Sequence, residues 1–216
     1  MKKITTILIC LIFSNVSCQE TLKTNDKSFI IGLKNSKVAS VQEVSKGFNY
    51  ILKYPNETNY PNRLNIKRVN GLLELSVNFI NGSQTILPFE FITYFGGSGG
   101  SSELRKERQN DEYTVGQHDF DNDGIEEILI GLKDKYSDDY SSVDFFVYKY
   151  FPPLNIKDTN RIENWKVYGH YQAPDILGDT KVIVKGAKVS VIMNAEADLY
   201  MEWTFEKDDF TEKGQI

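Results

Sequence analysis

The chain has 216 residues and a formal net charge of −5, with 40% hydrophobic and 12% aromatic residues. This composition is typical of a globular protein and excludes a disordered chain, and the length suffices for one domain with a sizeable core. A nucleic-acid partner requires a basic surface that neutralises phosphates, so the acidic balance argues against nucleic acid as a ligand.

The N-terminus has the features of an export signal. Met1–Lys3 is a short basic segment, and Ile4–Phe13 is an apolar segment too short to span a bilayer as a helix. Small and polar residues follow at Ser14–Ser17, directly before Cys18. This arrangement resembles a bacterial lipoprotein signal, which implies that residues 1–17 are removed and that Cys18 becomes the lipidated first residue.

One position departs from the lipoprotein pattern. Asn15 stands where lipoprotein signals usually have leucine, so ordinary signal-peptidase cleavage into the periplasm or medium stays open. The two cysteines of the chain are Cys10 and Cys18, and cleavage before Cys18 leaves no pair for an internal disulfide. We expect a membrane-anchored lipoprotein of the bacterial cell envelope, with a tether at residues 18–28 and a single β-rich domain at 29–216.

The first half of the domain predicts strands. Phe29–Leu33 and Phe48–Tyr54 have apolar strand-like sequence, whereas residues 34–47 are ambiguous, because valines recur there at helical spacing but valine is a mediocre helix former.

Two Asn-Gly pairs follow, at Asn70-Gly71 and Asn81-Gly82. Asn-Gly between apolar runs is the strongest short-range hairpin signal, because both central residues of a type I′ turn need positive φ. A three-stranded antiparallel meander is therefore predicted over Asn65–Val69, Leu72–Ile80 and Gln84–Phe95.

The second half continues the strand pattern. Lys181–Met193 predicts a hairpin that turns at Lys185-Gly186-Ala187, and the segment after Glu206 is polar. About nine or ten strands and little helix are expected, so the predicted class is all-β, with antiparallel sheets in a sandwich or partial-propeller-like arrangement. The further strands are expected at Glu126–Leu132, Val143–Phe151, Trp165–Tyr171, Lys181–Lys185, Lys188–Met193 and Leu199–Phe205.

The segment Val143–Phe151 is unusually aromatic. Strand alternation sends Phe146, Tyr148 and Tyr150 to one face, with Phe145, Val147 and Phe151 nearer the other. Large apolar side chains on both faces imply that both faces of this strand are covered, so most of these aromatics are expected in the core.

The stretch with the clearest chemistry is Asp119–Ile130, which reads DFDNDGIEEILI. Ca²⁺ takes six to eight oxygens at about 2.3–2.6 Å, and carboxylates at alternate positions of a tight loop can converge on one ion. Gly124 stands where such a loop turns sharply.

The 13 residues from Asp119 to Gly131 resemble the calcium loop of FG-GAP/VCBS-type repeats, with the pattern D-x-D-x-D-G-x-x-[DE] followed by a strand. The resemblance implies bound Ca²⁺, held by the ligand set of Asp119, Asp121, Asp123, the backbone carbonyl of Ile125, and Glu127.

Three other interpretations of the loop are weaker. An EF-hand needs glutamate at loop position twelve, where this chain has Ile130, and a helix rather than apolar strand sequence after it. A complete propeller needs several such loops, and the motif occurs once. A plain acidic turn leaves four carboxylates repelling one another, so a structural cation that clasps two strands is favoured.

No sequence pattern for catalysis stands out. His118 precedes the loop, and His170 has no partner at a telling spacing. Asp138 and Asp139, with Asp144, could form a weak second cation site or a carboxylate pair for acid–base chemistry.

The expected function is therefore an exported, calcium-binding β domain that acts as a binding or inhibitor-like module on an unknown protein or glycan at the envelope. The alternative is an envelope enzyme that acts on glycans or peptides through its acidic residues.

Overall fold

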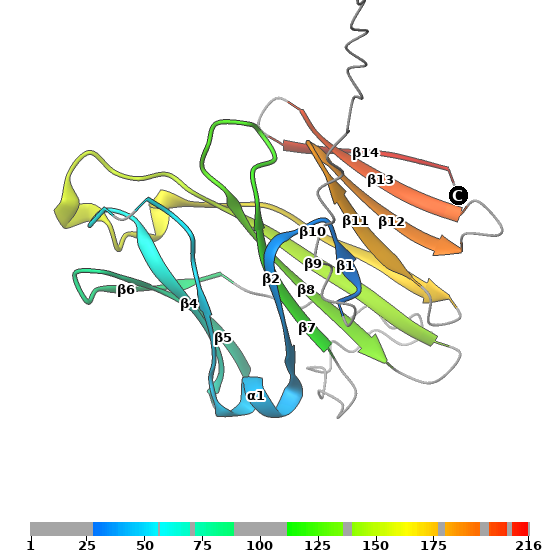
Figure 1. The fold of residues 1–216 in the computed structure, drawn as a ribbon, viewed down its shortest axis with the longest axis horizontal. Helices are drawn as coiled ribbons and strands as arrows, with labels where there is room; N and C mark the ends of the chain where they lie inside the picture. Colours follow the sequence, from blue (N-terminus) through cyan, green and yellow to red (C-terminus); the bar gives the residue numbers. More distant parts are fainter. Residues whose placement is uncertain are drawn as a thin grey trace, which may run out of the picture.

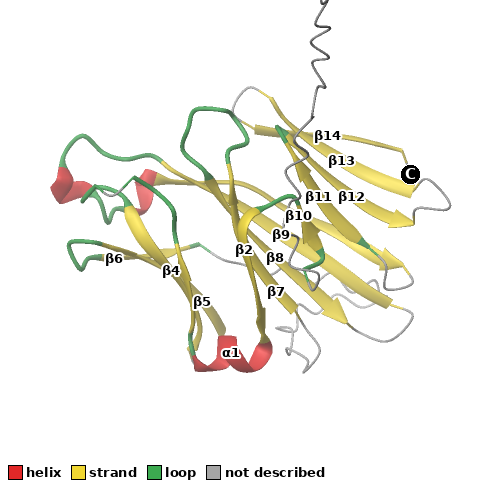
Figure 2. Ribbon diagram, in the orientation of Figure 1, coloured by secondary structure: helices red, strands yellow, loops and turns green. Residues whose placement is uncertain are grey.

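The structure is a computed structural model, and it describes residues 28–55, 57–69, 72–88, 112–135, 140–176, 180–194, 199–206 and 209–215. The predicted signal peptide and the lipidation site Cys18 lie outside these residues. Three β-sheets pack against one another as layers (Figure 1). Among the described residues, far more lie in strands than in helices (Figure 2), which confirms the all-β class.

The N-terminal sheet has four antiparallel strands in the order β3-β4-β5-β6. It contains the predicted meander, whose last strand ends at Leu87, directly before Pro88; proline has no N–H to donate to a strand ladder. The strands are β3 (Phe48–Ile51), β4 (Pro61–Val69), β5 (Leu72–Phe79) and β6 (Gln84–Leu87).

The central sheet has five antiparallel strands in the order β10-β9-β8-β7-β2. It is built from the aromatic and apolar segments of the second half of the chain and from one strand of the ambiguous segment 34–47. The strands are β2 (Lys34–Ser40), β7 (Glu112–His118), β8 (Glu127–Lys135), β9 (Tyr140–Tyr150) and β10 (Trp165–Ile176).

The ambiguous segment 34–47 is a strand followed by a short helix, α1 (Val41–Lys46). Ser40 Oγ accepts from Glu43 N at 3.3 Å, and Glu43 Oε2 accepts from Ser40 N at 2.8 Å. This capping box, rather than valine spacing, starts the helix. Two short 3-10 turns, η1 (Ile156–Asp158) and η2 (Ile162–Asn164), follow β9, and no helix of the described residues is long and apolar enough to cross a membrane.

The C-terminal sheet has five strands in the order β1-β11-β12-β13-β14, with β1 parallel to β11. Lys185 pairs with Lys188, so the predicted hairpin turn at Gly186-Ala187 is confirmed. The polar segment after Glu206 forms β14, a strand that its composition does not predict. The strands are β1 (Ile30–Ile31), β11 (Lys181–Lys185), β12 (Lys188–Asn194), β13 (Leu199–Glu206) and β14 (Asp209–Gln215).

The central sheet is covered on both faces. Phe146, Tyr148 and Tyr150 of β9 pack into the core shared with the N-terminal sheet, whereas Phe145 and Val147 pack into the core shared with the C-terminal sheet. The predicted alternation along β9 is therefore confirmed, and the strand is buried on both sides.

Two glycines of the central sheet let the segment Phe29–Leu33 pack closely against that sheet. A Cβ at Gly131 would meet the side chains of Ile30 and Phe29, and a Cβ at Gly116 would meet Leu33. Any larger residue would collide with this segment, so both positions need glycine for space. The two cores and the segment Phe29–Leu33 pack against β7, β8 and β9, and those strands position the acidic loop.

Candidate functional site

The acidic loop (residues 119–126) joins β7 to β8, and His118 pairs with Glu127 at its base. Asp119 Oδ2 accepts from Gly124 N at 3.0 Å, and Asp123 Oδ1 accepts from Ile125 N at 2.8 Å. Gly124 has φ +87°, which glycine adopts at little steric cost. The aspartates therefore shape the loop through its own backbone.

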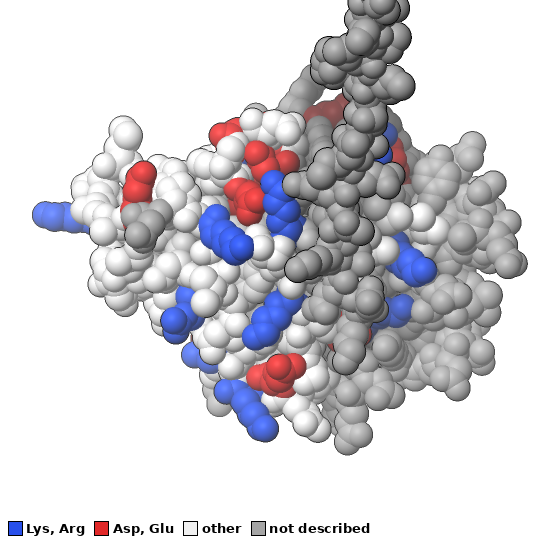
Figure 3. Space-filling model, viewed as in Figure 1, with Lys and Arg blue, Asp and Glu red and all other residues white. Residues whose placement is uncertain are grey.

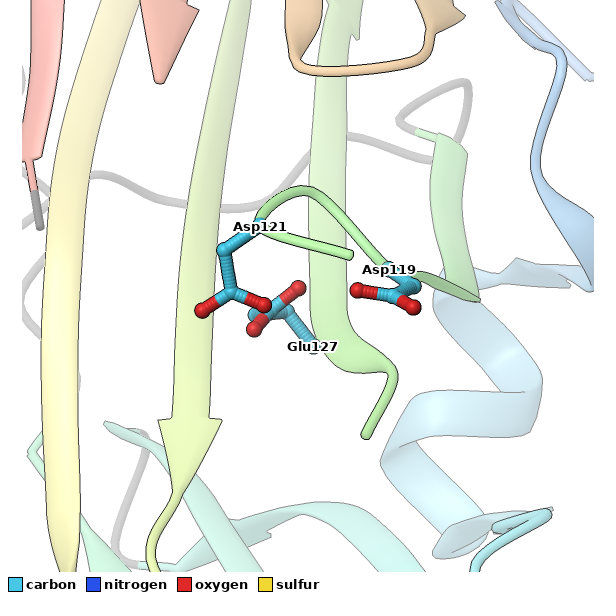
Figure 4. A group of neighbouring side chains, drawn as sticks. All are labelled: Asp119, Asp121 and Glu127. Carbon is cyan, nitrogen blue, oxygen red and sulfur yellow. The ribbon is translucent and has the colours of Figure 1, made fainter. Parts of the chain in front are cut away.

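Three carboxylates converge inside this turn. One oxygen each of Asp119, Asp121 and Glu127 lies within 4.8 Å of the others, and the three side chains point toward one another (Figure 4). Asp119 and Asp121 come from the loop, and Glu127 is the first residue of β8. The group could hold a metal ion.

A lysine that the sequence analysis did not single out enters the same group. Lys149 Nζ lies 2.5 Å from Asp123 Oδ2 and 3.2 Å from Glu127 Oε1, and it also contacts Asp121 Oδ2. The side chain of Lys149 is 4% exposed and that of Glu127 is fully buried. Such a buried ammonium is stable only beside carboxylates, because an unpaired buried charge is very unfavourable.

Strand register explains why Lys149 is there. Ile128 of β8 pairs with Tyr148 of β9, so Lys149 follows directly opposite Glu127. Alternation places Lys149 on the same face as Phe145 and Val147, the face that packs on the C-terminal sheet. A lysine at an apolar position of a doubly covered strand was the signal in the sequence that a buried anionic partner exists.

Burial and the neighbouring charges shift the pKa values of Glu127 and Lys149. Burial raises the pKa of Glu127 to about 7, opposed by the hydrogen bond from Phe120 N to its Oε2 at 2.8 Å. Burial alone would lower the pKa of Lys149, but its bonds to Asp121 and Asp123 and the charge of Glu127 raise it above its ordinary range. The ammonium is therefore strongly held as a cation.

The donor set suits a hard cation. Asp119 Oδ1 is buried and makes no hydrogen bond among the described residues, and Glu127 Oε1 makes none besides its ion pair with Lys149. Carboxylate oxygens are the ligands that Ca²⁺ and Mg²⁺ prefer. The residues fit a divalent cation by chemistry, but Lys149 contacts part of the same ligand set.

The other predicted ligands stand differently. Asp123 lies outside the converging group of three and bonds Lys149 instead. Ile125 donates its N–H to Asp123; its carbonyl as a metal ligand stays a prediction. On the surface, acidic side chains gather over the β7–β8 loop, with lysines and arginines spread across the rest of this face (Figure 3).

The remaining catalytic candidates do not join this site. His118 Nε2 lies 2.8 Å from the carbonyl oxygen of Gly186, which ties the base of the loop to the β11–β12 turn. Asp144 is buried in β9, while Asp138, Asp139 and the side chain of His170 lie outside the described part of the chain.

A second feature, which we call the notch, lies beside the end of β3. It encloses about 260 Å³. Among its lining residues, Ile51 is 71% exposed and Ile80 is 45% exposed. Arg63 is exposed and makes no ion pair among the residues that the structure describes. The notch is lined by Ile51, Leu52, Tyr54, Pro55, Tyr60, Pro61, Asn62, Arg63 and Ile80.

The notch and the acidic loop are connected through Tyr150, the neighbour of Lys149. The Tyr150 ring lies 6.1 Å from that of Tyr60, and its hydroxyl donates to the Asn59 carbonyl at 2.7 Å. Burial raises the pKa of Tyr60, and the charges of Glu57 and Asp123 raise it further. Tyr150 therefore joins the strand that carries Lys149 to a wall of the notch.

Comparisons with known proteins leave the family open. No family model matches the chain, and no curated protein or solved structure is significantly similar to it. The resemblance to FG-GAP/VCBS-type calcium loops thus stays a prediction that rests on 13 residues, and the structure adds to it a group of three acidic residues that could hold a metal ion.

Proposed function

We propose that this protein is an exported, lipid-anchored binding module that binds a protein partner at the cell envelope through the notch. The observation that carries this proposal is a hollow lined in part by the exposed Ile51 and Ile80 and by Arg63, whose guanidinium makes no ion pair among the described residues. The N-terminal sequence with Cys18 supports export and lipidation.

The chemistry of the notch favours protein over glycan. Exposed isoleucines gain from burial against another apolar side chain, at about 25 cal/mol per Å² of apolar area. Arg63 can pair with a carboxylate in bidentate geometry. The partner we expect therefore presents an apolar side chain next to an aspartate or glutamate.

Calcium has a structural part in this proposal. Ca²⁺ bound at Asp119, Asp121 and Glu127 would hold the turn between β7 and β8, and binding to the folded state alone raises stability by mass action. Extracellular modules bind Ca²⁺ with a Kd of about 10⁻⁴–10⁻³ M, so millimolar calcium would matter outside the cell. We expect millimolar Ca²⁺ to raise the Tm and Asp121→Ala to abolish the rise; no change on adding EDTA would contradict calcium binding.

Site-specific crosslinking in the intact envelope tests the partner. A photo-crosslinking residue at Ile51 should capture one protein species, and Arg63→Glu should abolish that capture without lowering the Tm. The matched control position is Ile86, which is 59% exposed but does not line the notch. Equal capture from both positions, capture of glycan alone, or no capture would contradict the proposal.

An envelope enzyme that acts on glycans or peptides through acidic residues is the alternative. It requires substrate turnover that is lost on substitution of Asp138 or Asp139, which a screen of envelope glycans and peptides would reveal.

A further inference from the structure

We propose that the Lys149 ammonium occupies the cation position of the acidic loop, so that a divalent cation binds there only by displacing it. This inference rests on the proposed calcium binding and adds its regulation. It makes the loop an exchange site between a tethered ammonium and a diffusible metal ion.

The first argument is that both cations need the same carboxylates, since the group of three that could hold a metal ion shares Asp121 and Glu127 with Lys149. Lys149 contacts Asp121, Asp123 and Glu127, which are three of the four carboxylates that the loop pattern assigns to a metal. A divalent ion needs these oxygens at about 2.3–2.6 Å, and an ammonium nitrogen in contact with them occupies that volume. Simultaneous binding at one centre is therefore sterically and electrostatically excluded.

The second argument is that the ammonium satisfies the site well. Its three N–H groups match three carboxylates, and its stem is buried beside the core shared with the C-terminal sheet. Since Lys149 is part of β9, it reaches the carboxylates without losing the translational freedom that a free ion loses on binding.

The third argument is that exchange is possible. The ammonium leaves excess negative charge on four carboxylates, and Asp119 Oδ1 makes no hydrogen bond among the described residues. A divalent ion brings a second positive charge and can use this oxygen. The Phe151 ring already lies 5.7 Å from Lys149 Nζ and is 45% exposed, so the ammonium keeps an aromatic contact when it moves outward from the carboxylates.

Calcium titration by calorimetry tests the exchange, with wild type, Lys149→Met and Lys34→Met compared in metal-free buffer. If Lys149 fills the site more than about nine-tenths of the time, removing it should tighten the apparent Kd at least about tenfold. Lys34→Met is the matched control, because Lys34 lies 3.7 Å from Glu126 beside the loop but is 66% exposed and touches none of the four carboxylates. It should change the Kd less than about twofold, since exposed charge pairs contribute little.

The outcomes separate this inference from the proposed function. Calcium binding by Lys149→Met alone supports the inference and contradicts calcium binding by the natural chain. Equal binding by wild type and Lys149→Met overturns the inference and leaves calcium binding intact. Binding by neither overturns both.

A second measurement covers the case in which Lys149→Met does not fold. Acylation of Lys149 in the wild-type protein, followed by mass spectrometry, should be slow without metal because the side chain is 4% exposed. Millimolar Ca²⁺ should speed it several-fold, while labelling of Lys34 stays constant. Unchanged labelling of Lys149 with calcium present would overturn the inference.

Discussion

The acidic loop and the notch present opposite physical problems. The loop places buried charge, with Glu127 and Lys149 almost fully removed from solvent, at the end of the central sheet. The notch leaves apolar surface exposed, with Ile51 and Ile80 facing solvent beside the N-terminal sheet.

The two problems have different solutions. Buried charges must be paired within the chain, or by an ion, because an unpaired buried charge is strongly destabilising. Exposed apolar groups do not destabilise the fold, and in the proposed function a partner buries them. The loop should therefore determine stability and the notch should determine recognition, and the following predictions test that division.

The largest expected effect is on stability at the loop. Glu127→Ala removes a fully buried partner of Lys149 and the acceptor for Phe120 N, so we expect a loss of about 3 kcal/mol in the free energy of unfolding. The measurement is urea unfolding in EDTA.

The adjacent glutamate is the matched control for this substitution. Glu126→Ala breaks the 3.7 Å contact with exposed Lys34, for which we expect less than about 1 kcal/mol. Equal losses at the two positions would show that burial of charge does not govern the loop.

Tyr150 tests the connection between the two regions. Tyr150→Phe removes the hydrogen bond to the Asn59 carbonyl, and we expect a loss of about 1–2 kcal/mol in the free energy of unfolding. Because Asn59 precedes Tyr60 in the wall of the notch, crosslinking from Ile51 should also fall.

Tyr148→Phe is the control for Tyr150→Phe. Tyr148 lies two residues away on the same face of β9 and donates to the Pro88 carbonyl at 2.8 Å, away from the notch. It should lower stability by a similar amount without affecting crosslinking. A loss of crosslinking in both variants would mean that the notch responds to general destabilisation.

Much of the fold was predictable from short-range patterns. The apolar runs on either side of the two Asn-Gly pairs predicted the meander, and the alternation along Val143–Phe151 predicted a strand covered on both faces. The strand β14 was not predictable, because its polar sequence has little β-propensity of its own. It forms a strand because it pairs with β13.

The site was predictable only in part. The convergence of Asp119, Asp121 and Glu127 follows from local spacing in one loop. Lys149 is more than twenty residues away, and only the register between β8 and β9 brings it opposite Glu127. The notch depends on where separate loops meet in space, which no local pattern encodes.

The smallest effect on stability, and the sharpest test of the division, is expected at the notch. Ile51→Asp replaces a side chain that is 71% exposed on an edge strand, so the free energy of unfolding should change by no more than about 0.5 kcal/mol. Capture of the partner by a crosslinker at Ile80 should nevertheless be lost, because a carboxylate at position 51 would lie directly across the ladder from Arg63, occupy its guanidinium and remove the apolar contact that the partner needs. Ile86→Asp, on the same sheet but outside the notch, should leave both stability and capture unchanged. If Ile51→Asp unfolds the protein, the exposed isoleucines serve the fold rather than recognition, and the contrast between the two regions fails.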